Sequence, residues 1–109
     1  MFGRKKKVEQ LGTAFDRLLN YNYLKNKSID EQFIELADVL ITHRPVVINF
    51  EEIQSGHEID RAVAFLSGIV YALNGEVHRL GAETFLFATE EALKDGSLRY
   101  YINDVGQDN

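Results

Sequence analysis

The chain has 109 residues, of which 45% are apolar and 27% are charged, and its formal net charge is −5. This length suits one compact domain, and the absence of cysteine excludes disulfide frameworks, thiolate metal sites and cysteine nucleophiles. No apolar run has the length of a membrane-spanning helix, and no apolar core follows the basic N-terminus as in a secretory signal.

Positive charge is concentrated at the N-terminus, whereas the rest of the chain is acidic. Positions 4–7 are all basic, and residues 1–7 include no aspartate or glutamate. An acidic body would be repelled by phosphates, so nucleic acid is not an expected partner. The basic cluster, in contrast, suits an anionic membrane surface.

Residues 1–20 have the pattern of an amphipathic membrane-targeting helix, because apolar residues recur at helical spacing from Val8 to Leu19. Such a helix lies in the membrane interface with its apolar side chains in the acyl boundary. The same pattern fits a helix that packs on its own domain or on a protein partner. The residues expected to bind membrane are Met1, Phe2, Arg4, Lys5, Lys6, Lys7, Val8, Leu11 and Phe15.

Residues 21–27 are predicted to form a short edge strand or a linker, and residues 28–104 the packed core domain. Ser28 precedes Glu31 by three positions, which is the capping-box spacing that opens a helix. Pro45 marks the end of this helix, because the residue before a proline disfavours helical backbone. Its predicted buried stripe is Ile29, Phe33, Leu36, Ala37 and Leu40.

The apolar run at 46–50 predicts a strand that is covered on both faces near the centre of a sheet. A second helix is predicted from about 57 to 73, and from Ala62 onward it is apolar almost all round. Ala64, Gly68 and Ala72 form a row of small side chains at four-residue intervals. One small sheet cannot cover both sides of such a helix, so we expect a protein contact there, from a second copy of the chain.

Asn74 and Gly75 end this helix, because both residues tolerate left-handed backbone. Two strands are then predicted at about 76–80 and 83–88, joined by a hairpin turn, and a last strand at 98–103. Residues 105–109 are predicted to be a frayed tail. In the strand at 83–88 both faces are apolar, so the sheet face away from the helices is also expected to be covered.

The expected fold is an α/β two-layer sandwich, in which two helices pack on a small mixed sheet of four to five strands. The N-terminal amphipathic helix is added to this core. The strand–helix–strand order predicts a parallel pair of strands with a right-handed crossover.

No constellation of residues indicates catalysis, a metal site or a cofactor, so we expect a protein that is not an enzyme. The histidines, His43, His57 and His78, lack the spacing of metal ligands on a helix face. The adjacent pairs Glu51-Glu52 and Glu90-Glu91 lie in connecting segments, where solvated carboxylates are the usual interpretation. A small-molecule sensor is also disfavoured, because the sequence offers few polar groups that would converge on a pocket.

Arg79 lies within a predicted strand, on the same face as Val77. A positive group beside Phe85 would be suited to gripping an acidic, apolar peptide. The alternative is an arginine that extends to solvent at the sheet edge without a binding role.

Several segments together resemble the SepF family of cell-division proteins. The longest is Ala-Val-Ala-Phe-Leu-Ser-Gly-Ile-Val-Tyr-Ala-Leu-Asn-Gly-Glu-Val-His-Arg-Leu-Gly at 62–81, followed by Thr-Phe-Leu-Phe-Ala-Thr at 84–89. Upstream, Glu-Leu-Ala-Asp at 35–38 and Arg-Pro-Val-Val-Ile-Asn-Phe at 44–50 fit the same family. The resemblance covers about residues 29–90, and the basic N-terminus resembles the membrane-targeting segment of that family.

The resemblance implies a homodimer, able to form a higher polymer, that binds the C-terminal peptide of FtsZ and an anionic membrane. Arg79 and Phe85 match positions that contribute to the FtsZ pocket. The positions expected to support self-association are Ala64, Leu66, Gly68, Ala72 and Gly75.

The implied protein is cytoplasmic and peripheral on the inner face of the membrane at the division site, where it tethers FtsZ filaments and cross-links the Z-ring. The alternative from the residues alone is a soluble α/β homodimerisation module whose N-terminal helix packs on a protein partner.

Overall fold

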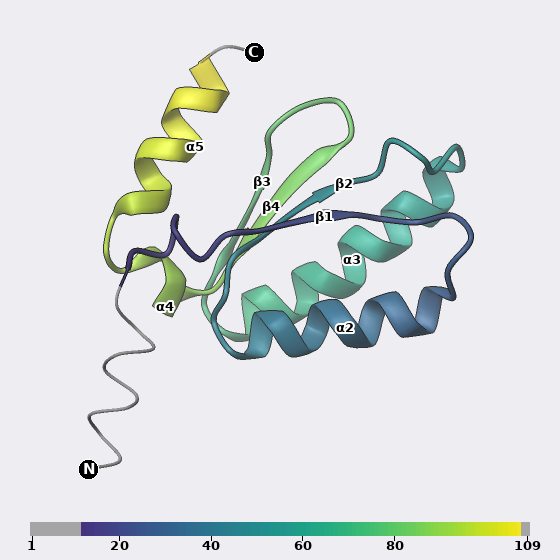
Figure 1. Ribbon diagram of the computed structural model, residues 1–109, viewed down its shortest axis with the longest axis horizontal. Coiled ribbons are helices and arrows are strands. Elements are labelled where there is room, and N and C mark those ends of the chain that lie inside the picture. Colours follow the sequence, from purple (N-terminus) through teal and green to yellow (C-terminus); the bar gives the residue numbers. More distant parts are fainter. Residues whose placement is uncertain (1–11, 108–109) are drawn as a thin grey trace.

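A four-stranded mixed sheet is the framework of the computed structural model, which describes residues 12–107 (Figure 1). The strands lie in the order β1-β2-β4-β3, so β1 and β3 are the two edges of the sheet. β1 runs parallel to β2, whereas β2 with β4 and β3 with β4 are antiparallel. In chain order the elements are β1 (Leu19–Asn22), α2 (Ile29–Ile41), β2 (Val46–Asn49), α3 (Gly56–Ala72), β3 (Glu76–Arg79), β4 (Thr84–Ala88), α4 (Glu90–Leu93) and α5 (Ser97–Gln107).

The predicted helix boundaries of α2 and α3 are set by local hydrogen bonds. The Ser28 hydroxyl accepts from the backbone N–H of Glu31, and the Ser55 hydroxyl accepts from that of Glu58. At the end of α3, Asn74 adopts a left-handed φ of 57°, and the N–H of Gly75 donates to the carbonyl of Val70. The expectation that Asn74 and Gly75 end this helix is therefore confirmed.

Helices α2 and α3 lie side by side on one face of the sheet and bury the main core against it (Figure 1). Their core side chains recur at intervals of four residues, as amphipathic helices require. Fully buried residues of this core include Leu36, Leu40, Ala62, Leu66, Val70, Val46, Ile48 and Phe87. The predicted α/β sandwich, with two helices packed on the sheet, is therefore confirmed. The segment before α2 contains a strand, β1.

The other face of the sheet is also covered, by α5. Leu98 is fully buried, and Tyr101, Ile102 and Val105 pack against Val47 and Leu86 of the sheet. The strand predicted at 98–103 is thus wrong, because this segment is helical. Its apolar residues follow helical spacing from Leu98 to Val105 rather than strict alternation, and the helix continues to Gln107, into the segment expected to be a tail.

Residues 13–18 form a turn rather than the second half of an N-terminal helix. Two hydrogen bonds to residues far along the chain stabilise the turn. The N–H of Ala14 donates to the Asp95 carboxylate at 2.8 Å, and that of Phe15 donates to the Ser97 hydroxyl at 3.0 Å. Asp95 lies in the loop before α5 and Ser97 is the first residue of α5, so the turn is joined to the start of that helix. Residues 1–11, where most of the predicted amphipathic helix falls, lie outside the described residues.

An ion pair ties α5 to β3. Arg99 donates to both carboxylate oxygens of Glu76, at 2.6 and 2.5 Å, and His78 lies 2.7 Å from the same carboxylate. These partners, Arg99 first, lower the pKa of Glu76 from 4.5 to about 2. This ion pair therefore links α5 to the sheet, in addition to the apolar packing of α5 on the sheet face away from α2 and α3.

Gly75→Ala should destabilise the fold, because a Cβ there would lie 2.2 Å from the Ala88 carbonyl oxygen and 2.7 Å from the Cα of Thr89. We expect a loss of about 1–3 kcal/mol in the free energy of unfolding, measured by urea denaturation. Gly56→Ala is the matched control, because no atom lies within 4 Å of its Cβ position. Equal stabilities for the two variants would contradict the packing described here.

Glu76→Gln should make stability less dependent on pH. The folded pKa of Glu76, about 2, is below its ordinary value of 4.5, so its contribution is present above about pH 4.5 and is lost as the pH falls toward 2. We expect the substitution to lower the unfolding free energy by about 1 kcal/mol at pH 7, allowing for solvent screening, and by less at pH 3. Glu83→Gln, in the exposed hairpin loop, is the control, and the same pH profile for both variants would refute the ion-pair argument.

Candidate functional site

The hairpin of β3 and β4 brings Arg79 and Phe85 together, as the sequence predicted. The two residues are cross-strand partners, and the Arg79 guanidinium carbon lies 5.7 Å from the centroid of the Phe85 ring. Arg79 is fixed there because Nε donates to the carbonyl of Gly81 at 3.0 Å and Nη2 donates to that of Ala82 at 2.7 Å. The hairpin turn thus holds a cation over an aromatic ring, and among residues 12–107 no carboxylate forms an ion pair with Arg79.

Phe85 is the outer member of a row of aromatic rings that leads into the core. It meets Phe50 edge-on at 5.9 Å, and Phe50 in turn contacts Tyr23 at 5.2 Å. Phe50 and Tyr23 are buried, whereas Phe85 is half-buried and Arg79 is exposed. The arrangement can bind a peptide that presents an apolar side chain to Phe85 and a carboxylate to Arg79.

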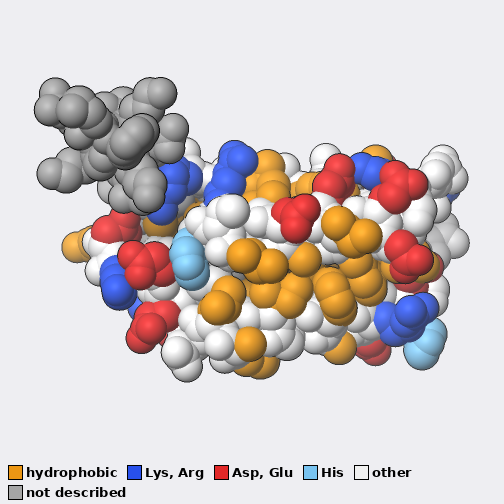
Figure 2. Space-filling view, turned by 90° about the horizontal axis from the view of Figure 1, so that it is seen from below, with side chains coloured by type: hydrophobic (Ala, Val, Ile, Leu, Met, Phe, Trp, Pro, Cys, Tyr) orange, Lys and Arg blue, Asp and Glu red, His pale blue; other side chains and the backbone are white. Residues whose placement is uncertain are grey.

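Helices α2 and α3 present a second candidate surface, an apolar face that points away from the sheet (Figure 2). On α3, Ala64, Gly68 and Ala72 are all exposed, as the small-residue row requires. A Cβ built on Gly68 would meet no atom of this chain within 4 Å. The face can therefore be approached closely by another backbone.

The sequence predicted a protein contact on α3 but did not place the large side chains of this apolar face among the site residues. Ile34 is 63% exposed and Tyr71 is 59% exposed, while Phe33 and Phe65 stack across α2 and α3 at 4.6 Å. The signal for Ile34 was present in the chain, because Ile34 and Ile41 stand seven residues apart, off the buried stripe of α2. Members of this apolar face are Phe33, Ile34, Ile41, Ala64, Phe65, Gly68, Tyr71 and Ala72.

Leu66 and Gly75, which were predicted to support self-association, have structural roles within a single chain. Leu66 is fully buried in the core beneath α3, so it cannot belong to a surface. Gly75 is required where the end of α3 passes close to Ala88 and Thr89. The i, i+4 pattern of small residues identified the exposed side of α3 correctly, but resemblance in sequence did not distinguish surface positions from core positions.

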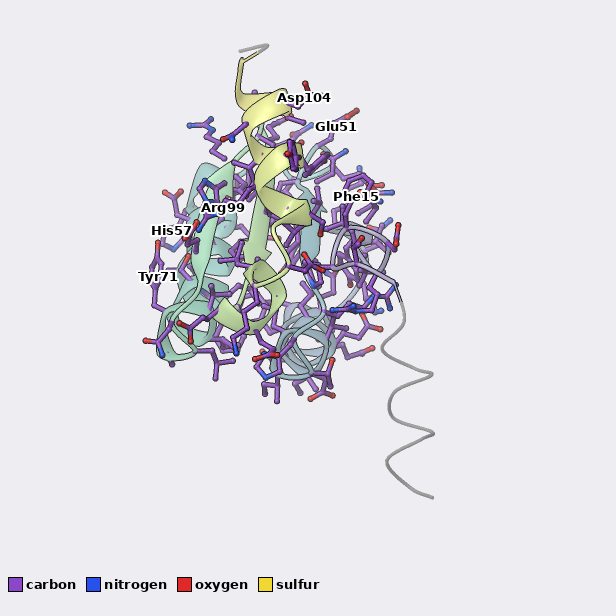
Figure 3. The ribbon with its side chains drawn as sticks, turned by 90° about the vertical axis from the view of Figure 1, so that its left-hand side faces the viewer. Phe15, Glu51, His57, Tyr71, Arg99 and Asp104 are labelled. Atoms are coloured by element: carbon purple, nitrogen blue, oxygen red, sulfur yellow. The ribbon has the colours of Figure 1, made fainter. Side chains whose placement is uncertain are left out.

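Phe15 is the one predicted membrane residue within the described part of the chain. Its ring lies 5.3 Å from that of Tyr101, and Figure 3 shows Phe15 and Arg99 on either side of α5. Phe15 lines a groove of about 380 Å³ with Ser97, Tyr100, Tyr101 and Asp104. Within residues 12–107, no helix is long and apolar enough to cross a membrane.

The histidines lie apart and have local roles or none. His43 Nδ1 is 2.8 Å from the hydroxyl of Thr89, and this hydroxyl caps α4 by accepting from the backbone N–H of Ala92. His78 belongs to the Glu76 ion pair, and His57 is exposed at the start of α3 (Figure 3). Across the described residues, no three His, Asp or Glu side chains are grouped so that they could hold a metal.

Comparison with known proteins gives one consistent family. Residues 24–92 match the family described as Cell division protein SepF. The chain is 40% identical to Cell division protein SepF of Bacillus licheniformis over 73 residues, which cover 67% of this chain and 48% of that protein. It is 42% identical to the protein of the same name from Lacticaseibacillus casei over 72 residues, covering 66% and 47%.

A third relative, Cell division protein SepF of Listeria monocytogenes, is 40% identical over 70 residues, which cover 64% of this chain and 45% of the relative. The matched region thus spans about half the length of these relatives. Because the family match covers more than half of the chain, the chain belongs to the SepF family of cell-division proteins.

Proposed function

We propose that this SepF-family chain is a non-enzymatic cell-division adaptor that binds the C-terminal tail of FtsZ and holds FtsZ filaments at the inner face of the cytoplasmic membrane. The observation that carries the proposal is the fixed position of Arg79 over Phe85 at the end of an exposed hairpin. An acidic, apolar peptide tail is the ligand that this pair fits. No cofactor takes part.

The active unit in this proposal is a homodimer formed through the apolar face of α2 and α3. That face exposes large aliphatic and aromatic side chains, which a second copy would remove from water. The exposed row at Ala64, Gly68 and Ala72 supports close packing of α3 against its counterpart. Two copies then present two tail-binding hairpins and two N-terminal segments, and further contacts between dimers would extend the array into a polymer.

Membrane attachment in this proposal comes from the basic and apolar residues of the N-terminal segment. A single segment of this kind binds weakly, because one short apolar anchor with few charges gives marginal affinity. A dimer offers two such segments and an FtsZ filament many binding tails, so avidity raises the effective affinity by orders of magnitude. The tether would thus assemble only where filaments are present, at the division site.

One observation favours a second function, a homodimerisation module whose N-terminal region binds protein rather than lipid. Phe15, expected in a membrane face, packs instead against Tyr101 of the same chain, and Asp104 lines the same groove. A carboxylate there would disfavour anionic lipid. Independence from lipid would identify this alternative.

Co-sedimentation of the full chain with anionic vesicles and a synthetic FtsZ C-terminal peptide tests the proposal. We expect the chain and the peptide to pellet together. Arg79→Ala should leave the chain in the pellet but weaken peptide binding by about tenfold, because a charge-assisted contact is lost. Replacement of Lys5, Lys6 and Lys7 by Gln should release both chain and peptide into the supernatant, more so at high salt.

Arg44→Ala is the matched control for loss of a surface arginine, since Arg44 lies near β1 rather than at the hairpin. If both substitutions weaken peptide binding equally, Arg79 acts through the overall charge of the chain and the hairpin is not a specific binding site. A chain that stays in the supernatant at low salt would refute the membrane half of the proposal.

A further inference from the structure

A groove of about 380 Å³ lies along α5, close to the point where the described chain begins. Its lining residues are Phe15, Ser97, Tyr100, Tyr101 and Asp104. Three of them are aromatic, and Tyr100 is 84% exposed. An open, largely aromatic groove of this kind is suited to binding a short segment with apolar side chains.

Hydrogen bonds fix the chain at the edge of this groove. The N–H of Phe15 donates to the Ser97 hydroxyl at 3.0 Å, and the Phe15 ring lies 5.3 Å from that of Tyr101. The carbonyl of Gly12, the first described residue, accepts from Arg17 Nη1 at 3.1 Å. Three residues extend at most about 11 Å, so the chain before Gly12 leaves within that distance of Phe15.

The sequence before this point continues an apolar row that already packs on α5. The row consists of Val8, Leu11, Phe15 and Leu18. Its two described members, Phe15 and Leu18, both pack against α5, Leu18 through the apolar cluster that contains Leu98. Leu11 and Val8 are the next members upstream, so they are the apolar side chains of the row that lie closest in sequence to the open part of the groove.

Residues 1–11 are long enough to reach the whole groove. Eleven residues extend up to about 40 Å, whereas α5 rises only about 10 Å from Ser97 to Asp104. Because a short stretch of chain joins this segment to the groove wall, its effective concentration there is on the order of millimolar. A second copy reaches that level only at about millimolar protein, so a weak apolar contact selects the chain's own segment.

Charge contributes less than this tether. Positions 4–7 are basic, Glu9 offsets one of these charges, and Asp104 in the groove is exposed. Among residues 12–107 no cation forms an ion pair with Asp104, so its carboxylate is available to a lysine of the segment. An exposed pair is weak, so the tether and the apolar side chains determine which occupant binds.

We propose that residues 1–11 dock in the α5 groove of their own chain, with Val8 and Leu11 against Tyr100. Docking itself does not depend on lipid, but its consequence rests on the proposed membrane attachment. Val8 and Leu11 are expected to enter the membrane, so a docked segment is withheld from it. Lipid must compete with the groove, which weakens attachment of a single chain and favours arrays that present many segments at once.

Paramagnetic broadening in the 15N-labelled full chain tests the docking. A spin label is placed on α5 through Asn103→Cys, which is unique because the chain has no cysteine. We expect the amide signals of Val8 and Leu11 to broaden, and the broadening to weaken when Tyr100→Ala is added. Tyr100 is exposed, so its loss does not open the core. Leu24→Ala, at an exposed apolar residue beyond β1, is the matched control and should keep the broadening.

Equal broadening with and without Tyr100→Ala would overturn the docking, because the tether alone would then explain it. Cysteine-free 15N-labelled chain is also mixed with unlabelled, spin-labelled chain. Broadening of Val8 and Leu11 in this mixture would overturn the proposal, since a second copy would then supply the segment.

Binding to anionic vesicles tests the consequence for lipid. Tyr100→Ala should bind about threefold more tightly than the unmodified chain, because a segment docked about two thirds of the time has its affinity lowered by that factor. Leu24→Ala should bind as the unmodified chain does. Equal affinities for Tyr100→Ala and the unmodified chain would overturn the competition with lipid. If neither binds vesicles at low salt, the proposed membrane attachment fails, while the broadening still decides the docking.

Discussion

The outer face of α2 and α3 is the constraint on which the rest of the account depends. The sheet buries one side of each helix, and α5 covers the sheet's other face, so within residues 12–107 no further element lies over Ile34, Phe65 and Tyr71. A contiguous apolar surface of this kind is unusual on a protein that stays alone in water. In the proposed function, a second copy that covers this face makes a bivalent unit from a domain with one Arg79–Phe85 hairpin, and bivalency strengthens attachment to a filament.

The sheet then determines where binding groups can lie relative to that face. β2 and β4 are central and largely buried, so they fix the geometry, while the edges β1 and β3 carry the exposed polar and charged groups. Arg79 stands at the hairpin end of β3, and β1 forms the opposite edge of the sheet. Both edges thus remain accessible when α2 and α3 are covered.

Much of this organisation could be predicted from the sequence, because short-range signals specify it. The Ser28 cap, the Asn74-Gly75 terminus and the apolar run at 46–50 each act within a few residues. The juxtaposition of Arg79 and Phe85 followed from strand alternation and hairpin pairing. The errors came from long-range contacts: residues 13–18 are held by Asp95 and Ser97, more than eighty positions away, and α5 is helical where its short apolar pattern also suited a strand. Leu66, which is buried, was assigned to self-association by the family resemblance alone, which does not distinguish surface positions from core positions.

Sedimentation equilibrium of the full chain tests the central claim, that the apolar face of α2 and α3 is a dimer interface. We expect a dimer whose dissociation constant rises about a hundredfold in Phe65→Asp and in Ile34→Asp, because each would bury an unpaired charge. Tyr100→Asp, at an 84% exposed aromatic on α5, should leave the dimer unchanged. A chain that is monomeric at high concentration, or a dimer lost only in Tyr100→Asp, would contradict the account.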